Sequence, residues 1–164
     1  MTPADIEQLR TAIEVSREAS RRGDEPYGAI LVDGDGTVVL RAGNTQHTRR
    51  DCTGHAETNL LRTATRRFDA ESLARCTVYA SGEPCPMCAG AIYWSNVRRV
   101  VFALDIVRMR ALAGPGADEL LLGCREVLKH GMHRVEVLGP ALEEEAAAVL
   151  AAHYADHARG SADG

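Results

Sequence analysis

The chain has 164 residues, of which 45% are hydrophobic, and a formal net charge of −4 at pH 7. This length and apolar content are typical of one globular domain with a buried core. The acidic balance argues against a chain built chiefly to neutralise nucleic-acid phosphates. Arginine doublets occur at four places, and we interpret them as part of a solvated surface.

The first residues are charged and contain no apolar signal core, and no stretch approaches the about 18 apolar residues that a membrane span needs. We therefore expect a cytoplasmic protein with no membrane partner, whose thiols stay reduced. In that setting the cysteines indicate metal binding or catalysis rather than disulfides. They are Cys52, Cys76, Cys85, Cys88 and Cys124.

The first third of the chain predicts a helix followed by a hairpin. Apolar residues recur with a mostly helical period up to about Arg21. Two β-rich runs, 27–33 and 37–43, are separated by the turn sequence Gly-Asp-Gly at 34–36, so they indicate two antiparallel strands.

Helical and buried-strand patterns alternate through the rest of the chain, which predicts a layered α/β sheet. In chain order we expect a helix at 55–67, a strand at 76–81, a helix at 86–95, a strand at 98–104, helices at 106–112 and 118–129, a strand at 134–139 and a closing helix at 139–157. We predict a single domain over residues 1–159 and a disordered tail over 160–164.

Cys85 and Cys88 raise the main chemical question, because Cys-x-x-Cys serves redox pairs, structural zinc sites and catalytic zinc sites alike. Pro86 favours a helix start, so both cysteines can face one point near that helix end. The positive helix end is expected to lower both thiol pKa values, and thiolates are what a metal needs. A redox pair would be expected directly after the first βαβ strand. The mid-chain position therefore disfavours a redox function.

The other candidate ligands lie in the run DCTGHAET, residues 51–58. Thr53 is expected to cap the following helix, which would place His55 near a second positive helix end. On a regular helix His55 and Glu57 would point about 200° apart, so they line one cavity only at an irregular helix start.

Two kinds of zinc site fit these residues. A structural zinc would use four ligands, which would be Cys52, His55, Cys85 and Cys88. A catalytic zinc would use one histidine and two thiolates and leave its fourth position for water. Glu57 favours the catalytic site, because a carboxylate beside that water can accept a proton and return it during hydrolysis.

Residues 55–57 (HAE) and 84–88 (PCPMC) resemble the H-x-E…P-C-x-x-C signature of the zinc-dependent cytidine deaminase superfamily. PYGAILVD resembles the first strand of that family, and Gly43-Asn44 resembles its substrate-binding asparagine. The run SGEPCPMCAGAIYWSNVRRVVFA is especially similar to bacterial guanine deaminases and to tRNA adenosine deaminases. The resemblance extends over about residues 5–105.

The resemblance implies an α/β fold: a three-layer α/β/α sandwich around a central mixed five-stranded sheet. It also implies one zinc ion per chain, bound by His55, Cys85 and Cys88, with Glu57 as the catalytic proton carrier of a hydrolytic deaminase. It implies a homodimer as well. The substrate contacts that it implies are Tyr27, Asn44, the backbone N–H of Ala56 and backbone atoms of Ser81, Glu83 and Pro84.

Four further residues have both a functional and a structural interpretation. We expect Trp94 to pack beside the site rather than contact the substrate, and His47 to have a surface role rather than reach the pocket mouth. Asp118 and Glu119 lie where guanine deaminases tend to supply a second acidic proton shuttle. We interpret these two as the start of a solvated helix.

Three functions compete for this sequence. The acidic balance and the single lysine, Lys129, favour a small free nucleobase or related aminated heterocycle as substrate. Guanine is our first expectation, followed by cytosine, isoguanine and aminotriazines. A tRNA adenosine deaminase is the alternative, but it would need a basic surface for the RNA backbone. A non-catalytic zinc-stabilised binding module is a further alternative, which the presence of Glu57 disfavours.

Two departures from the family pattern leave bases other than guanine as possible substrates. The run DCTGHAE differs from the DPTAHAE of guanine and tRNA deaminases, so Gly54 and the missing proline would reshape the pocket floor. Guanine deaminases close their site with a C-terminal segment that ends in an aromatic residue. The end of this chain, AAHYADHARGSADG, gives no convincing match to that segment.

Overall fold

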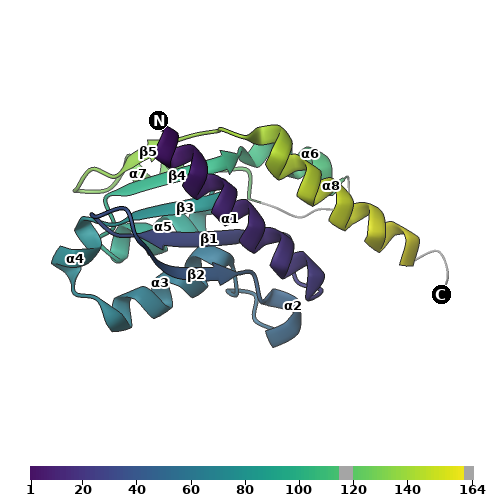
Figure 1. The fold of residues 1–164 in the computed structure, drawn as a ribbon, viewed down its shortest axis with the longest axis horizontal. Helices are drawn as coiled ribbons and strands as arrows, with labels where there is room; N and C mark the ends of the chain where they lie inside the picture. Colours follow the sequence, from purple (N-terminus) through teal and green to yellow (C-terminus); the bar gives the residue numbers. More distant parts are fainter. Residues whose placement is uncertain (115–119, 161–164) are drawn as a thin grey trace.

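The computed structural model describes residues 1–114 and 120–160. In it the β-rich runs form a five-stranded sheet (Figure 1). The strands lie in the order β2-β1-β3-β4-β5. β1 pairs antiparallel with β2 and β3, whereas β3, β4 and β5 run parallel. The strand bounds are β1 Gly28–Val32, β2 Val38–Gly43, β3 Thr77–Gly82, β4 Arg99–Leu104 and β5 Glu136–Leu138. The predicted mixed sheet is confirmed.

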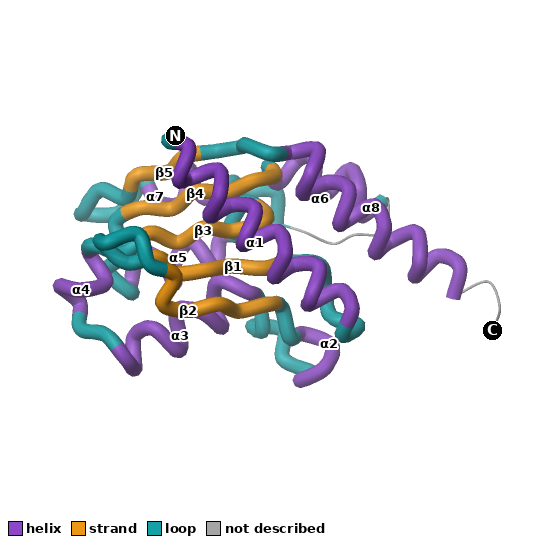
Figure 2. The backbone as a smooth tube through the Cα atoms, viewed as in Figure 1, coloured by secondary structure: helices purple, strands orange, loops and turns teal. Residues whose placement is uncertain are grey.

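Helices cover both faces of the sheet, because successive strand side chains point to opposite sides (Figure 2). In β1, for example, Leu31 packs on one face and Ile30 on the other. The first face carries α3 Ala56–Arg67, α4 Ala70–Ala74, α5 Pro86–Trp94 and α7 Cys124–Leu128. The second carries α1 Pro3–Arg21, α6 Ile106–Ala113 and α8 Glu143–Gly160. The three-layer α/β/α sandwich is therefore confirmed.

The strand directions bring several loops to one end of the sheet. β3 and β4 run parallel and end there, and β1, which is antiparallel to β3, begins there. The segments before β1, after β2, after β3 and after β4 therefore meet. In sheets of this kind ligands bind beside the carboxyl ends of the parallel strands, which directs attention to this end.

The α1 helix is fastened to the sheet by a buried carboxylate. Asp5 is 2% exposed, and its Oδ1 accepts a hydrogen bond from the Tyr79 hydroxyl at 2.7 Å. Arg99 donates to both carboxylate oxygens, at 2.8 and 3.0 Å. The Arg99 guanidinium holds the pKa of Asp5 well below its ordinary value of 3.8. Burial, followed by the Asp5 carboxylate, raises the pKa of Tyr79 to about 12.

The helix expected at 118–129 is the main error in the predicted elements. Residues 115–119 lie outside the described part, and α7 begins only at Cys124, whose N–H donates to a carboxylate oxygen of Glu83 at 2.9 Å. The closing helix begins at Glu143, because Leu142 before it has a positive φ of 62°. The short helices α2 Gln46–Arg49 and α4 were not predicted. The first helix and the hairpin are confirmed.

Two expectations about chain organisation stay predictions. One is the single domain over residues 1–159. The other is the tail over 160–164, of which residues 161–164 lie outside the described part, while Gly160 is the last residue of α8. Within residues 1–114 and 120–160, no helix combines the length and apolar character needed to cross a membrane.

Replacing Asp5 by Asn is expected to lower the free energy of unfolding by about 2 kcal/mol at neutral pH, since it removes charged hydrogen bonds from a buried site. The folded state depresses the pKa of Asp5. The carboxylate therefore stabilises the protein fully at pH values above its ordinary pKa of 3.8, and this stabilisation is lost as the pH falls toward the depressed pKa of the folded state. The difference in free energy of unfolding between the wild type and Asp5→Asn should therefore be smaller at about pH 3 than at neutral pH. Urea unfolding at both pH values measures it.

Glu145→Gln is the matched control, because the pair between Arg10 and Glu145 is exposed and joins α1 to α8. It should cost much less than Asp5→Asn, because exposed ion pairs contribute little to stability. Equal losses in the two variants would show that Asp5 does not fasten α1.

Candidate active site

His55 is the N-cap residue of α3, at the end of a closely packed loop. Asn59, one turn into α3, donates to the carbonyl oxygens of Gly43 and Gly54, both at 3.1 Å. Its third contact is with Thr45 Oγ1 at 2.9 Å. A Cβ on Gly54 would also lie 2.9 Å from that oxygen, so a larger residue would displace the loop. The glycine of DCTGHAE thus allows the approach that positions His55.

The predicted capping role of Thr53 is wrong. No side chain caps the start of α3, and the Thr53 hydroxyl donates to Asp51 Oδ1 at 2.6 Å instead. The Asp51 carboxylate also accepts from the Thr53 N–H at 2.8 Å. The two residues form a local turn that stabilises the loop before His55.

The second ligand-bearing helix begins as the sequence predicts. Cys85 is the N-cap of α5, Pro86 is its first residue, and Cys88 follows within the first turn. Proline suits this position because its fixed φ is helical and its missing N–H has no intrahelical partner there. Cys88 is buried, and Cys85 is partly exposed toward the cavity.

His55, Cys85 and Cys88 converge on one point. His55 Nδ1 lies 3.5 Å from Cys85 Sγ and 3.6 Å from Cys88 Sγ, and one ligand atom from each residue lies within 4.8 Å of the others. One imidazole and two thiols are the donor set of a three-ligand zinc site with an open fourth position. The exposed Cys52 is not part of this group, so the four-residue structural set is not brought together.

The two thiols share their protons unequally, contrary to the expectation that both pKa values fall. The hydrogen bond with Cys88, together with one to His55, lowers the pKa of Cys85 to about 4. The same pairing with Cys85, followed by burial, raises the pKa of Cys88. Two adjacent thiols cannot ionise independently, and Cys85 becomes the first thiolate.

Glu57 lies beside the metal-ligand group. Its side chain is in the first turn of α3, and the residue is 6% exposed and lines the same cavity as His55. His55 and Glu57 do not point about 200° apart as they would on a regular helix, because His55 has extended backbone angles of φ −67° and ψ 151°. Burial raises the pKa of the Glu57 carboxyl, with a further contribution from the charge of Cys85.

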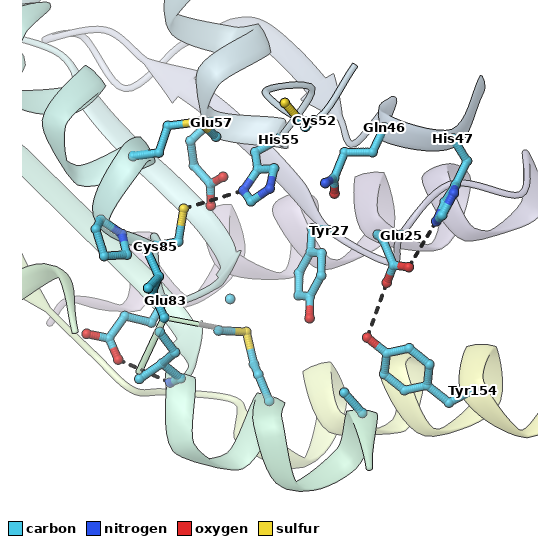
Figure 3. A pocket seen from close by; sticks show the side chains of 17 residues that line it. Glu25, Tyr27, Gln46, His47, Cys52, His55, Glu57, Glu83, Cys85 and Tyr154 are labelled. Atoms are coloured by element: carbon cyan, nitrogen blue, oxygen red, sulfur yellow. Dashed lines mark hydrogen bonds and ion pairs between the residues drawn. The ribbon is translucent and has the colours of Figure 1, made fainter. Parts of the chain in front are cut away.

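A cavity of about 650 Å³ opens from this group at the end of the sheet where the loops meet (Figure 3). Its walls come from the segments before β1, after β2, after β3 and after β4, and from α8. Glu25, Glu57 and Glu83 are among its lining residues, whereas no arginine or lysine is among those described. This wall offers a phosphate group no arginine or lysine as a partner.

The predicted substrate contacts divide into two groups. Tyr27 and Glu83 line the cavity, whereas Asn44, Ala56, Ser81 and Pro84 are not among the lining residues. Ser81 Oγ accepts a hydrogen bond from the Gly28 N–H at 3.0 Å, which links β3 to β1.

The carboxylate of Glu83 fastens two helix starts. It accepts hydrogen bonds from the N–H groups of Ile106 at 3.1 Å and Cys124 at 2.9 Å, the first residues of α6 and α7. One carboxylate thereby joins both helices to the segment that carries Cys85. Ile106 is itself a cavity residue, so Glu83 holds part of the wall in place.

The side chain of Asn44 forms hydrogen bonds with Gln46. Asn44 is 1% exposed, its Oδ1 accepts from the Gln46 N–H at 2.8 Å, and its Nδ2 donates to Gln46 Oε1 at 2.7 Å. Gln46 lines the cavity. The amide that faces the cavity is therefore that of Gln46, which sequence reasoning missed.

The expectations for Trp94 and His47 have different outcomes. Trp94 is 84% exposed at the end of α5, so the prediction that it packs beside the site is wrong. His47 is exposed, as expected, and it also lines the cavity mouth. Asp118 and Glu119 lie outside the described residues.

Three more cavity residues were not predicted: Glu25, Met109 and Tyr154, the last of which belongs to the C-terminal run that gave no convincing match to a site-closing segment. Met109 enters the wall because Gly82 has no side chain, since a Cβ there would lie 2.4 Å from the methionine sulfur. The Tyr154 hydroxyl donates to Glu25 Oε2 at 3.2 Å although the two residues are 129 positions apart.

A model of the cytidine and deoxycytidylate deaminase zinc-binding region matches residues 3–104, which include all three metal ligands and Glu57. The chain belongs to this family. Membership in the cytidine and deoxycytidylate deaminase family identifies the metal that the cluster fits as zinc. It also identifies the chain as a deaminase, a hydrolase of C–N bonds.

Relatives in this deaminase family act on different amines. The chain is 40% identical over 151 residues to a probable cytosine deaminase of Schizosaccharomyces pombe, covering 89% of this chain and 90% of that one. It is 32% identical over 152 residues to a tRNA-specific adenosine deaminase of Bacillus subtilis, covering 89% and 86%. A solved guanine deaminase from Nitrosomonas europaea superposes with a TM-score of 0.78 at 23% identity over 94% and 85% of the chains, which is a likeness of fold.

Cys52→Ser is expected to keep about one zinc per chain, whereas Cys85→Ser should lose most of it, since only Cys85 belongs to the three-ligand group. Elemental analysis after dialysis against a metal-free buffer measures the zinc, and circular dichroism verifies the fold. If the two variants lost zinc equally, the site would be the four-ligand structural type, with Cys52 as a ligand beside His55, Cys85 and Cys88.

Proposed function

We propose that this chain hydrolyses the amino group of a small free nucleobase or a related aminated heterocycle. The observation that carries the proposal is the composition of the cavity. Metal ligands and a buried carboxylate lie together, and the described lining residues include three glutamates but no arginine or lysine. A nucleotide or an RNA backbone would bring phosphate into a cavity that offers it no cationic partner.

The proposed reaction exchanges the ring amino group for oxygen. Water adds its oxygen to the ring carbon that bears the amino group, the C–N bond breaks, and ammonia leaves, so that C–NH₂ becomes C=O. Zinc bound by His55, Cys85 and Cys88 would lower the pKa of a coordinated water and so supply a nucleophile at neutral pH.

Glu57 is the proposed proton carrier. Its carboxylate accepts a proton from water and delivers protons to the ring nitrogen and the departing amine. Two observations support this role: Glu57 lines the cavity beside His55, and it is shielded from bulk solvent. A buried carboxyl with a raised pKa is suited to hold a proton between these steps.

The proposed substrate contacts combine direct and indirect roles. Tyr27 forms a wall of the cavity, and Asn44 positions Gln46. By the family resemblance the N–H of Ala56 and the backbone from Ser81 to Pro84 would contact the edge of the base, and of these residues Gly82 and Glu83 line the cavity.

Cytosine takes first place among the bases, ahead of guanine. The match to the probable cytosine deaminase has 40% identity and covers 90% of that protein, whereas a match to a guanine deaminase of Bacillus subtilis, at 38% identity, covers 62% of that protein. Guanine, isoguanine and aminotriazines follow as candidates. The tRNA adenosine deaminase relative makes a tRNA substrate the alternative, which the anionic cavity disfavours.

Assembly and location are part of the same proposal. A homodimer is supported by exposed apolar side chains on α5, where Met87 is 37% and Trp94 84% exposed. A cytoplasmic location is supported by five free cysteines, because a reducing compartment keeps thiols available to zinc.

The zinc-loaded protein is expected to release ammonia from at least one free base in a panel of cytosine, guanine, isoguanine and aminotriazines. Activity should change less than about threefold between low and moderate salt, because the cavity has no phosphate contacts for ions to screen. A coupled ammonia assay measures both. Conversion of adenosine to inosine in a tRNA anticodon stem-loop, with every free base inert, would overturn the proposal in favour of the tRNA alternative.

Glu57→Gln is expected to lower kcat by about 10²-fold or more, which is the usual contribution of general acid–base catalysis. The variant should keep its zinc, since Glu57 is not part of the metal-ligand group. Steady-state kinetics and elemental analysis on the same preparation separate the two effects. A folded, zinc-loaded variant with activity close to that of the wild type would remove Glu57 from the mechanism.

A further inference from the structure

A second cluster of polar groups lines the cavity apart from the metal ligands. It consists of Glu25, which precedes β1, His47 in α2 and Tyr154 in α8. His47 Nε2 lies 3.1 Å from Glu25 Oε1, and the Tyr154 hydroxyl donates to Glu25 Oε2 at 3.2 Å. Figure 3 shows Tyr27 between this cluster and the metal ligands. None of the three has a role in the reaction proposed above.

The residues next to this cluster are fixed in the fold. Asp24, which precedes Glu25, is fully buried and accepts hydrogen bonds from the N–H and the hydroxyl of Thr48, at 2.9 and 3.0 Å. Thr48 directly follows His47, so this contact sets the spacing between Glu25 and His47.

Tyr154 is fixed in the same way from α8. His153, which precedes it, is 4% exposed and lies 2.8 Å from the Ser20 hydroxyl of α1. The α1 helix leads directly into the segment that carries Glu25. All three members of the cluster therefore adjoin an anchored residue, and the cluster is a built feature of the cavity rather than a chance contact of mobile side chains.

Glu25 retains hydrogen-bonding capacity toward the cavity. A carboxylate has about four acceptor positions, and the contacts with His47 and Tyr154 use one on each oxygen. The side chain is 27% exposed, so it is not sealed from a ligand. No arginine or lysine among the described lining residues competes for it. The cluster therefore presents an acceptor that a neutral hydrogen-bond donor can satisfy.

The size of the cavity makes this acceptor reachable by a substrate. Cavities of about 300–1,000 Å³ enclose whole drug-sized ligands, and this one measures about 650 Å³. A base whose amino group lies at the metal ligands turns its opposite edge toward the rest of the cavity. In a free base that edge carries the ring N–H at which a nucleoside would carry its sugar.

We infer that Glu25, positioned by His47 and Tyr154, is a second recognition subsite that binds a hydrogen-bond donor on the substrate edge remote from the reacting amino group. The inference rests on the proposed function and adds a specificity determinant to it. The donor has two sources, the ring N–H of a free base or a sugar hydroxyl of a nucleoside. Methylation of the ring nitrogen removes the first source, and the nucleoside supplies only the second.

The test compares cytosine, 1-methylcytosine and cytidine as substrates of the zinc-loaded wild type and of Glu25→Ala. The variant should lower kcat/KM for the donor-bearing substrate by about 10- to 100-fold, mainly through KM, and change that for 1-methylcytosine by less than about threefold. A loss confined to cytosine identifies the ring N–H, and one confined to cytidine identifies a hydroxyl. An equal change for all three substrates, or none, would overturn the inference.

Two further variants guard against a purely structural effect. Glu14→Ala removes an exposed carboxylate of α1 outside the cavity, with the same change in net charge, and should leave all three substrates unaffected. Tyr154→Phe removes only the hydroxyl that holds Glu25, so it should raise KM for the donor-bearing substrate and leave kcat unchanged. A fall in kcat with KM unchanged would contradict a positioning role.

Calorimetric titration separates failure of this inference from failure of the proposed function. If the wild type deaminates none of the bases in the panel, the proposed function fails, but the zinc-loaded protein should still bind the donor-bearing ligand, cytosine or cytidine, at least about 10-fold more tightly than 1-methylcytosine. Glu25→Ala should abolish that difference. Equal affinity of the wild type for all three ligands, or no binding of any of them, would overturn the subsite.

Discussion

The site depends on the meeting of two helix N-termini at one end of the sheet. α3 and α5 pack on the same face, and their N-cap residues are His55 and Cys85. An N-cap side chain projects from the helix end rather than from its flank, so two converging ends direct an imidazole and a thiol to the same point. Cys88 follows within the first turn of α5 and completes the group. The parallel run of β3 and β4 then supplies the loops that enclose this point as a cavity.

Carboxylates determine the rest of the cavity, each in a different way. Glu57 is buried beside the metal ligands and is suited to proton transfer. Glu83 turns its oxygens to the N–H groups that start α6 and α7, so it supports the wall. Glu25 keeps acceptor capacity toward the cavity. The described lining contains no arginine or lysine, so a phosphate group would find neither as a partner there.

Sequence patterns predict those features that depend on local spacing. The metal ligands and Glu57 stand in two short runs whose residue types define their chemistry. The alternation of strand and helix patterns predicts a layered α/β sheet, whereas the mixed five-stranded arrangement was implied by the family resemblance. Features that depend on distant contacts were not predictable. α7 starts where Glu83, 41 positions earlier, accepts the Cys124 N–H, and Glu25 meets Tyr154 across 129 positions. Trp94 was expected to pack beside the site, whereas at the end of α5 it is exposed.

The central claim is that the zinc has three protein ligands and one open position. X-ray absorption at the zinc edge of the zinc-loaded protein tests it most directly, because scattering distinguishes sulfur from nitrogen and oxygen. The account predicts two sulfur ligands at about 2.3 Å and two lighter ligands at about 2.0–2.2 Å, one from His55 and one from solvent. A spectrum that requires three sulfur ligands would contradict it, since Cys52 would then close the site and leave no position for the water that hydrolysis needs.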